Sequence, residues 1–205
     1  MASTYLSRTF STATNRKKFT ISFWLKRSKV GSGQELFGRN TALNDSGYNF
    51  LRFNGSDKLL FGIYNTNYRG TNRVFRDTNA WYHIVVYVNK RLDTGDDRVI
   101  MNVIGVRETS FSEDTDPAQN ADLPINDAVA HKIGLGNTEY FDGSMAHFHF
   151  IDGTQYAASD FGETESSSGI WKPKLSPSVT YGTNGFFLKF QDSSSLGDDS
   201  SGNTN

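Results

Sequence analysis

The segment from Tyr64 to Arg73 combines aromatic rings with amide and guanidinium groups. Aromatic rings can stack on the apolar face of a sugar, while amides and guanidinium groups can hydrogen-bond its hydroxyls. The same stretch is rich in Asn, Gly and Thr, which also favour turns without any ligand. We predict a ligand-facing loop here, with binding side chains from Tyr64, Asn65, Asn67, Tyr68, Arg69, Asn72 and Arg73.

Two histidines, His147 and His149, would project from the same face of a strand. This spacing can place two imidazoles on one metal ion, but no further ligand can be assigned from the sequence. The pattern favours the alternative of a polar outer face, with Ala146, Phe148 and Phe150 turned inward. His83 alternates with neighbours in an apolar run, so we expect a core or sheet-face histidine.

Paired carboxylates are the usual sign of glycoside hydrolysis. Glu163 and Glu165 form the only close Glu pair, in a Gly- and Ser-rich segment that favours a solvated loop. Asp114 and Asp116 lie in a polar stretch and favour the same interpretation. No G-x-S-x-G element accompanies any of the four histidines, so the sequence does not indicate a Ser–His nucleophile.

A period of two in hydrophobicity predicts the strands that would position these side chains. In residues 19–26 the odd positions are Phe, Ile, Phe and Leu, and the even positions are Thr, Ser, Trp and Lys. Only a strand sorts residues onto two faces in this way. Tyr48–Phe53 and Lys58–Tyr64 flank Asn54-Gly55, whose preference for positive φ angles predicts a tight hairpin.

A second hairpin is predicted from Trp81–Val88 and Arg98–Gly105. Further strands are expected at Ala130–Leu135, Ser144–Ile151 and Phe186–Phe190. Polar stretches, notably residues 65–78 and 109–127, are expected to separate the strands, and only residues 155–161 suit a helical turn. About ten short strands with almost no helix predict an all-β sandwich or barrel.

Composition narrows the functional class. The chain has 205 residues, and its 21 Lys and Arg nearly balance its 22 Asp and Glu, which argues against nucleic acid as a main partner. Because there are no cysteines, disulfides and thiolate metal sites are excluded. The first residues do not match a signal peptide and no apolar stretch reaches membrane-spanning length, so we expect synthesis in a cytoplasm and no membrane insertion.

Four segments resemble, in order, the laminin-G-like members of the concanavalin A-like lectin and glucanase superfamily. They are FTISFWLK from Phe19, WYHIVV from Trp81, IMNVIGV from Ile100 (with Ile104 where Asn is usual) and YFDGSMAHFHFI from Tyr140. The resemblance implies two curved antiparallel sheets in a jelly-roll sandwich, which we assign to residues 1–160. The E-x-D-x-E triplet of the superfamily's glucanases is absent, so we expect no enzymatic activity.

The continuation FIDGTQYAASDFGETESSSGIWKPK and the later YGTNGFFLKF resemble virion proteins of tailed, often marine, phages. We expect residues 161–191 to form an irregular C-terminal extension packed on the sandwich, with Trp171 as its anchor or, alternatively, as a binding platform. Residues 192–205 are polar and predict a flexible tail. They include LGDDSSGN, which resembles the linker that opens another module, so the natural chain could continue.

The resemblance also brings calcium into consideration, because laminin-G-like and related lectin folds often hold it at the rim of the sandwich. Calcium prefers six to eight oxygens from flexible loops, although acidic turns are also common without a metal. No other cofactor is expected. The candidate ligands are Asp93, Asp96, Asp97 and Asp142.

The function that these observations favour is a non-catalytic module on a virion surface that binds host glycans or another virion protein. One alternative is a purely structural capsid-decoration or tail module that makes only protein–protein contacts. A weaker alternative is an atypical glycoside hydrolase. The identity of the ligand, the oligomeric state and a capsid or tail location stay open at this point.

Overall fold

The alternating residues of β2 (Lys18–Arg27) face two different environments in the computed structural model, which describes residues 4–203. Phe19, Ile21 and Phe23 on one face are fully buried in the main core. Thr20 and Ser22 on the other face are buried as well. Both faces of this strand are therefore covered, the first by a second sheet and the other by the C-terminal extension.

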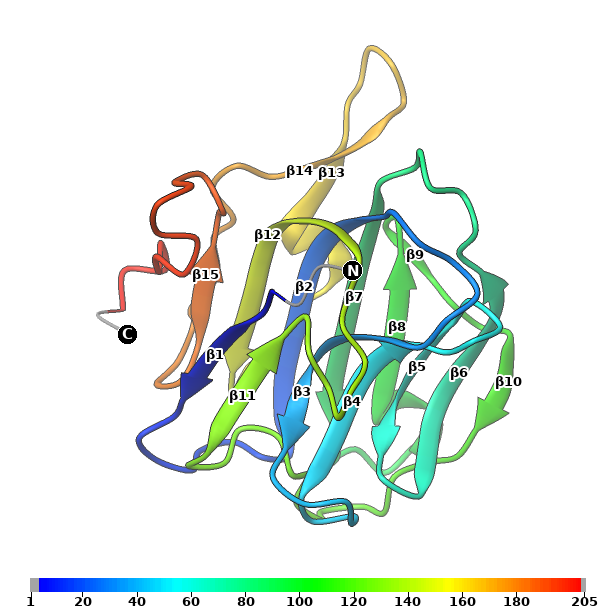
Figure 1. Cartoon of the computed structure of the whole chain (residues 1–205), viewed down its shortest axis with the longest axis vertical. Helices are drawn as coiled ribbons and strands as arrows, with labels where there is room; N and C mark the ends of the chain where they lie inside the picture. The colour runs from blue at the N-terminus through cyan, green and yellow to red at the C-terminus, as the bar shows by residue number, and fades with distance from the viewer. Residues whose placement is uncertain (1–3, 204–205) are drawn as a thin grey trace.

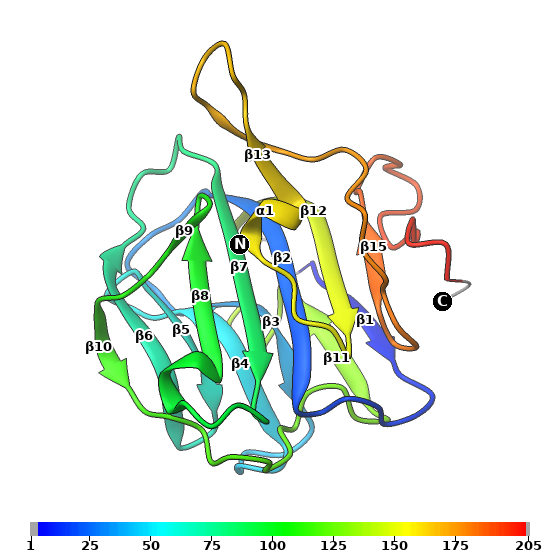
Figure 2. The same cartoon turned by 180° about the vertical axis from the view of Figure 1, so that it is seen from behind.

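The two large sheets are antiparallel and pack face to face, as Figures 1 and 2 show from opposite sides. One has seven strands in the order β1 (Leu6–Thr9), β11 (Ala130–Ile133), β3 (Gln34–Asn40), β4 (Tyr48–Phe53), β5 (Lys58–Ile63), β6 (Thr66–Val74) and β10 (Phe111–Asp114). The other has six in the order β15 (Phe186–Leu188), β12 (Gly143–Asp152), β2, β7 (Tyr82–Asn89), β8 (Val99–Val103) and β9 (Val106–Arg107). The predicted all-β sandwich is confirmed.

Three small elements complete the secondary structure of the described residues. A two-stranded hairpin is formed by β13 (Gly162–Thr164) and β14 (Trp171–Pro173). The predicted helical turn is present as α1 (Ala158–Phe161), and a 3-10 turn covers Gly95–Asp97. Within the described part of the chain, no helix has the length and apolar character needed to cross a membrane.

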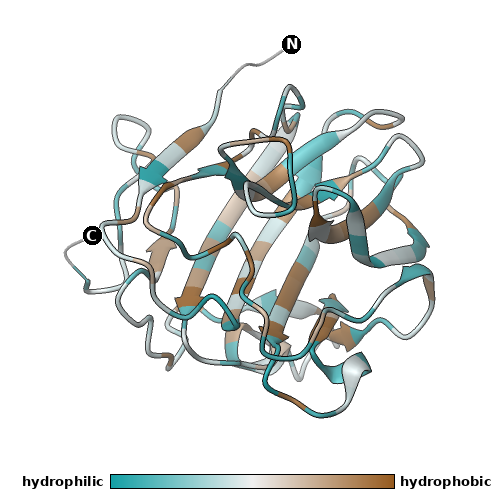
Figure 3. Cartoon of the chain, turned by 90° about the horizontal axis from the view of Figure 1, so that it is seen from below, coloured by the Kyte–Doolittle hydropathy of each residue, from teal (hydrophilic) through white to brown (hydrophobic). Residues whose placement is uncertain are grey.

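The core between the sheets is strongly aromatic, and Figure 3 shows apolar residues along the strands of both layers. Phe23 stacks on Phe148 of β12 at a ring-centroid distance of 5.1 Å, and Phe148 lies 5.4 Å from Phe37 of β3. Burying one such side chain contributes roughly 1.5–3 kcal/mol. The inward orientation predicted for Phe148 and Phe150 is confirmed. For Ala146 it was wrong, because Ala146 lies opposite Trp24, on the other side of an irregularity in β12, and is not part of the core.

Two predictions about loops were wrong. Residues 66–74, expected within a polar connection, form β6, which pairs with β5 and β10. The polar stretch of residues 109–127 contributes β10 in the same way. Side-chain polarity hid both strands, because backbone pairing with a neighbouring strand does not require an apolar side chain.

The first predicted hairpin is confirmed, but its turn differs from the prediction. β4 and β5 pair antiparallel, with Leu51 opposite Phe61. The left-handed residue of the turn is Asp57, at φ 64°, rather than Gly55. The Asn54 side chain accepts hydrogen bonds from the backbone N–H groups of Ser56 and Lys58 and closes a longer loop.

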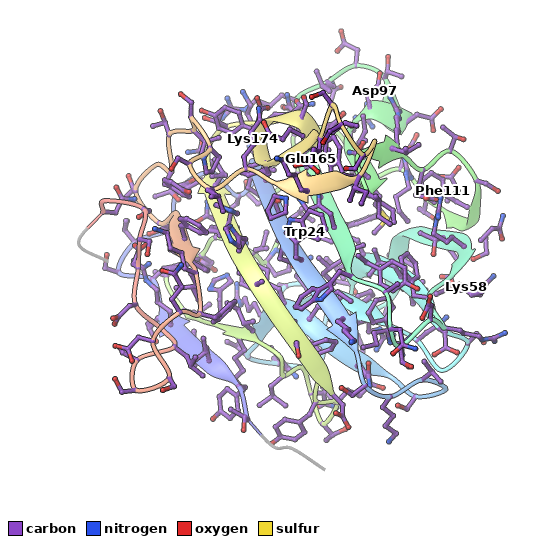
Figure 4. The ribbon with its side chains drawn as sticks, turned by 90° about the horizontal axis from the view of Figure 1, so that it is seen from above. Trp24, Lys58, Asp97, Phe111, Glu165 and Lys174 are labelled. Carbon is purple, nitrogen blue, oxygen red and sulfur yellow. The ribbon has the colours of Figure 1, made fainter. Side chains whose placement is uncertain are left out.

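The C-terminal extension covers the outer face of the six-stranded sheet. A small buried cluster joins Val85 and Ile151 of the sheet to Phe161 and Tyr181 of the extension. Trp171 is half-buried, and its indole N–H donates to His83 Nδ1 at 3.0 Å. Figure 4 labels Glu165 and Lys174 on this segment. Trp171 therefore acts as an anchor of the extension.

The polar outer face predicted for His147 and His149 was wrong for His149. Its imidazole is buried and stacks on Phe187 at 3.9 Å, and its Nδ1 shares a 2.9 Å hydrogen bond with the Tyr181 hydroxyl. His147 has a φ of 49° at an irregularity in β12, and the two imidazole centroids are 6.4 Å apart. Both histidines therefore pack against Phe187 of the extension.

The polar tail, expected to be flexible, lies along the free edge of β15. Asp199 bridges to Leu188, and the Ser200 N–H donates to the Phe187 carbonyl at 2.7 Å. The Asp199 carboxylate accepts from the Phe187 N–H at 2.9 Å, and Asn203 donates to the Gly182 carbonyl at 2.8 Å. Main-chain groups of residues 182–188 thus bind both the backbone and the polar side chains of the tail.

Candidate functional site

The middle of the seven-stranded sheet carries a set of outward-facing side chains from β4. Leu51 and Phe53 of this strand point into the core, so Tyr48, Phe50 and Arg52 point outward. Tyr48 and Phe50 form a small buried cluster with Leu60 of β5. Figure 1 shows the segment between β11 and β12 passing in front of this sheet.

A pocket of about 300 Å³ lies over these residues. Its walls come from the β3–β4 loop, from β4, from the β5–β6 turn and from the β11–β12 connection, so distant parts of the chain meet there. Pockets that hold small ligands begin at about this size. The lining residues are Leu43, Tyr48, Arg52, Tyr64, Asn137, Thr138 and Glu139.

One wall of the pocket is apolar and partly open to solvent. Tyr64 is 42% exposed and Leu43 is 50% exposed, whereas Tyr48 beside them is buried. The rings of Tyr48 and Tyr64 have centroids 6.5 Å apart and planes inclined by 50°. Tyr48 thus supports Tyr64 from behind, while Tyr64 keeps ring surface free for contact with a ligand.

The lining of the pocket also carries one cation and one anion. Arg52 Nη1 lies 3.6 Å from Glu139 Oε2, and its guanidinium lies 4.5 Å from the centroid of the Phe50 ring. The side chains of Arg52 and Glu139 are 29% and 37% exposed. Arg52 Nε and Glu139 Oε2 are buried and have no hydrogen-bond partner among the described residues, so contact with a ligand falls to the Nη atoms of Arg52 and to Glu139 Oε1.

A second carboxyl, that of Glu35 on β3, is buried beside the pocket. The Tyr48 hydroxyl donates to Glu35 Oε2 at 2.9 Å. A side chain at Gly136 would collide with the Glu35 carboxyl, since an added Cβ would lie 2.4 Å from Oε2. Burial raises the pKa of Glu35 to about 8, against smaller lowering effects of Tyr48 and Arg52, and burial also raises the pKa of Tyr48.

Comparison with known proteins supports the two-sheet sandwich described above. A family model for the concanavalin A-like lectin/glucanases superfamily matches residues 2–159. The chain belongs to this superfamily. Among curated proteins, the chain has no match.

Solved structures of the concanavalin A-like type share the fold at low sequence identity. A protein from Bacteroides ovatus assigned to carbohydrate binding has 18% identity and a TM-score of 0.51 over 72% of this chain, which spans 40% of the length of that protein. A heptameric SAP-like pentraxin from Limulus polyphemus has 13% identity and a TM-score of 0.51, with 89% of this chain and 87% of the pentraxin covered. Domain 4 of a GH43 extracellular arabinanase from Geobacillus stearothermophilus, solved with arabinotriose, has 16% identity and a TM-score of 0.50, with 76% and 78% covered.

The residues of the predicted ligand loop, Tyr64 to Arg73, lie in several different parts of the structure. Tyr64 lines the pocket, and the Asn65 backbone N–H next to it donates to Asp45 at 2.9 Å. Tyr68 lies in the core between the sheets, which contradicts its predicted orientation toward a ligand. Strand alternation explains the division, because a strand cannot direct consecutive side chains to the same face.

The other predicted binding residues make ionic and polar contacts at the β6–β10 edge. The side chain of Asn67 donates to Glu113, and Arg73 Nε donates to Glu108 at 2.6 Å. Asn72 donates to the Ser110 hydroxyl at 2.9 Å. These side chains have protein partners and do not line the pocket beside Tyr64.

The acidic candidates for calcium are also separated. Asp96 lies with Asp114 and Asp116, and their carboxylate oxygens are within 4.8 Å of one another, the one such acidic group among residues 4–203. The buried Arg69 guanidinium lies between them, 2.8 Å from Asp114 and 2.7 Å from Asp116. Arg69 thus already supplies a positive charge to this group.

The remaining acidic candidates have other surroundings. Asp93 accepts from the Gln119 amide at 2.9 Å, and Asp97 accepts from Arg107 at 2.9 Å. Asp142 lies just before β12, where its backbone carbonyl accepts from the Ser28 N–H at 2.9 Å. Figure 4 shows Asp97 and Phe111 at the side of the molecule away from the C-terminal end. Calcium binding by Asp93, Asp96, Asp97 and Asp142 stays a prediction.

The sequence reasoning missed Glu35, Tyr48, Arg52 and Glu139. Tyr48 and Arg52 lie in a strand that was predicted, and their alternation with Leu51 and Phe53 would have placed them on the outer face. No local pattern announces Glu35 or Glu139. They join the site through the pairing of β3 with β4 and through the course of the β11–β12 connection.

Proposed function

We propose that this chain is a non-catalytic glycan-binding module, and that the pocket bounded by Tyr64, Arg52 and Glu139 is its sugar site. The observation that carries the proposal is an exposed tyrosine ring facing a shared space with a guanidinium–carboxylate pair. The ring would stack on the apolar face of a sugar, and the charged pair would hydrogen-bond its hydroxyls. Asn137 and Thr138 add uncharged polar groups at the rim.

The superfamily fold is compatible with this role. Proteins of the same fold include one assigned to carbohydrate binding and an arabinanase domain solved with arabinotriose. At identities of 18% and 16%, these likenesses concern the fold. Since one fold hosts many functions, the proposal depends on the residues of the pocket.

The absence of catalysis is part of the proposal. Glycoside hydrolysis by the usual route needs two carboxyl groups on either side of the bond that breaks. Among the residues that line the pocket, Glu139 is the one carboxylic acid. Glu35 has the raised pKa expected of an acid catalyst, but it is fully buried and does not line the pocket.

We further propose that the module is displayed on a virion surface after synthesis in the host cytoplasm, where it would bind host glycans. The support is the resemblance of the segments after Phe150 to virion proteins of tailed phages. The pocket favours a glycan over another virion protein as ligand, because it is a small hollow rather than a broad apolar surface. Electron microscopy of the particle would test this location, which a position buried among other subunits would contradict.

Substitution of the exposed ring tests the sugar site. We expect the folded protein to bind glycans on an array. Tyr64→Ala should weaken binding to the strongest of these glycans about tenfold, or roughly 1.4 kcal/mol. The matched control is Tyr5→Ala, because Tyr5 is 44% exposed but lies outside the pocket. Isothermal titration with the best array ligand gives the affinities. An array without signal from folded protein, or equal losses in both variants, would contradict the proposal.

A further inference from the structure

The cation of the pocket already has an anionic partner. Arg52 lies between the Phe50 ring at 4.5 Å and Glu139 at 3.6 Å. The lining residues include no other Lys or Arg, and Glu139 balances the Arg52 charge. A ligand that enters this pocket therefore meets a neutral pair rather than a free guanidinium.

We propose that the pocket selects neutral or amine-bearing sugars and rejects sugars that carry a carboxylate. This inference rests on the proposed function, since it concerns the ligand class of the same site. A carboxylated sugar would have to displace Glu139 from Arg52 or lie beside it as a like charge. Either route costs free energy, because like charges at close range repel and an unpaired carboxylate loses its partner.

Hydroxyl groups fit the same pair without displacing it. A hydroxyl can donate to a carboxylate and accept from a guanidinium, whereas a carboxylate ligand can only accept. The side chains of Arg52 and Glu139 are both partly exposed, so two neighbouring hydroxyls of a neutral sugar can contact both members. An ammonium group on the sugar would instead gain an ionic contact with Glu139.

The buried carboxyl of Glu35 acts in the same direction. It lies directly behind the pocket wall, bonded to Tyr48 at 2.9 Å, and it interacts electrostatically with Arg52 and Glu139. Whenever Glu35 ionises, the group formed by Glu35, Glu139 and Arg52 acquires a net negative charge. Glu35 therefore adds either no charge or a negative charge behind the pocket, and never a positive one.

Glu139→Gln tests the inference, because it keeps the shape of the side chain and frees the Arg52 charge. The probes are oligogalactosides and oligogalacturonates of equal length, which differ in the carboxylate. We expect wild type to bind the galactosides at least tenfold more tightly. In Glu139→Gln, affinity for the galacturonates should rise at least tenfold.

The control variant Glu163→Gln makes the same charge change on β13, outside the pocket, and should leave both affinities unchanged. In Arg52→Gln/Glu139→Gln the gain should disappear, because it depends on Arg52. Thermal unfolding midpoints confirm that each variant is folded. Wild type that prefers galacturonates, or no gain in Glu139→Gln, would overturn the inference and leave the sugar site standing. Folded wild type that binds neither these probes nor any array glycan would reject the proposed function itself.

Discussion

Glu35 is a carboxylic acid that the fold keeps away from water. Its pKa is raised to about 8 from an ordinary value of 4.5, mainly through burial. The folded state therefore favours the protonated acid, while the unfolded chain ionises near pH 4.5. The contribution of Glu35 to the stability of the fold is fully present below pH 4.5 and is lost progressively as pH rises toward 8. Glu35 thus makes the fold more stable in mild acid than in weak base.

Glu35→Gln should remove this pH dependence while keeping an acceptor for the Tyr48 hydroxyl. The stability of the variant relative to wild type should rise between pH 4 and pH 8 by roughly 2–5 kcal/mol, at about 1.4 kcal/mol per pKa unit. Urea unfolding at both pH values measures it. Glu113→Gln is the control, since Glu113 is partly exposed. A constant difference between Glu35→Gln and wild type would show that Glu35 is ionised in the folded protein.

At the scale of elements, the C-terminal extension is held on the six-stranded sheet through neutral histidines. The Trp171 indole N–H can only donate, so His83 Nδ1 must accept, and its Nε2–H donates to the Ser22 hydroxyl at 3.0 Å. Trp24 of β2 also stacks on the His83 ring, at a centroid distance of 4.9 Å. A proton on Nδ1 would turn this acceptor into a donor and break the contact with Trp171.

Acid should therefore release the extension before the sandwich unfolds. Burial lowers the pKa of His83 to about 3 and that of His149 well below 6.5, and the nearby His147 lowers both further. The neutral contacts are fully present above pH 6.5 and weaken progressively as pH falls toward 3, where the folded protein also takes up the protons. Hydrogen exchange, corrected for intrinsic rates, should show residues 156–181 losing protection at pH 4.5 while β2 stays protected.

His83→Gln should make this release less sensitive to acid. Glutamine offers an oxygen to the Trp171 indole and an N–H to Ser22, but it does not titrate. His131→Gln is the matched control, because His131 is also buried with a pKa lowered to about 4 but stacks on Phe10 in the core. Equal protection of the extension at both pH values in wild type would refute the mechanism.

The elements differ in how well the sequence predicts them. In residues 19–26 of β2 apolar and mainly polar positions alternate, so the strand and its inward face follow from sequence alone. β7 is a nearly continuous apolar run, which predicts a strand but does not tell the inward Ile84 and Val86 from the outward Val85. β6 could not be predicted in this way. Its polar residues Asn67 and Arg69 find their partners only in the folded chain, in residues about 45 positions later such as Glu113 and Asp114. Likewise, only Tyr64 of the pocket was predicted, since its charged partners come from a distant connection.

At the scale of the whole molecule, the two outer faces of the sandwich have different roles. The seven-stranded sheet leaves its centre open as a pocket, whereas the six-stranded sheet is covered by the extension. Segments from both ends of the chain meet in a buried polar network. Asp152 Oδ1 accepts from Asn126 at 2.7 Å and from Asn15 at 3.2 Å, and its Oδ2 accepts from the Asn184 N–H at 3.2 Å.

This network predicts that the sandwich and residue 184 unfold as one unit, even though the hairpin of the extension can open by itself. Asp152→Ala removes an acceptor from the buried donors of Asn126 and Asn184 and from the part-buried amide of Asn15, which should cost about 3–5 kcal/mol. The loss should appear as one transition at lower urea, with tryptophan fluorescence and far-ultraviolet circular dichroism coinciding. Asp160→Ala, at the first turn of α1, removes an acceptor for the exposed Ala157 N–H and should cost below about 1 kcal/mol. Separate fluorescence and dichroism transitions in Asp152→Ala would mean that the polar network stabilises only its own corner of the fold, so that the segment around Asn184 unfolds independently of the sandwich.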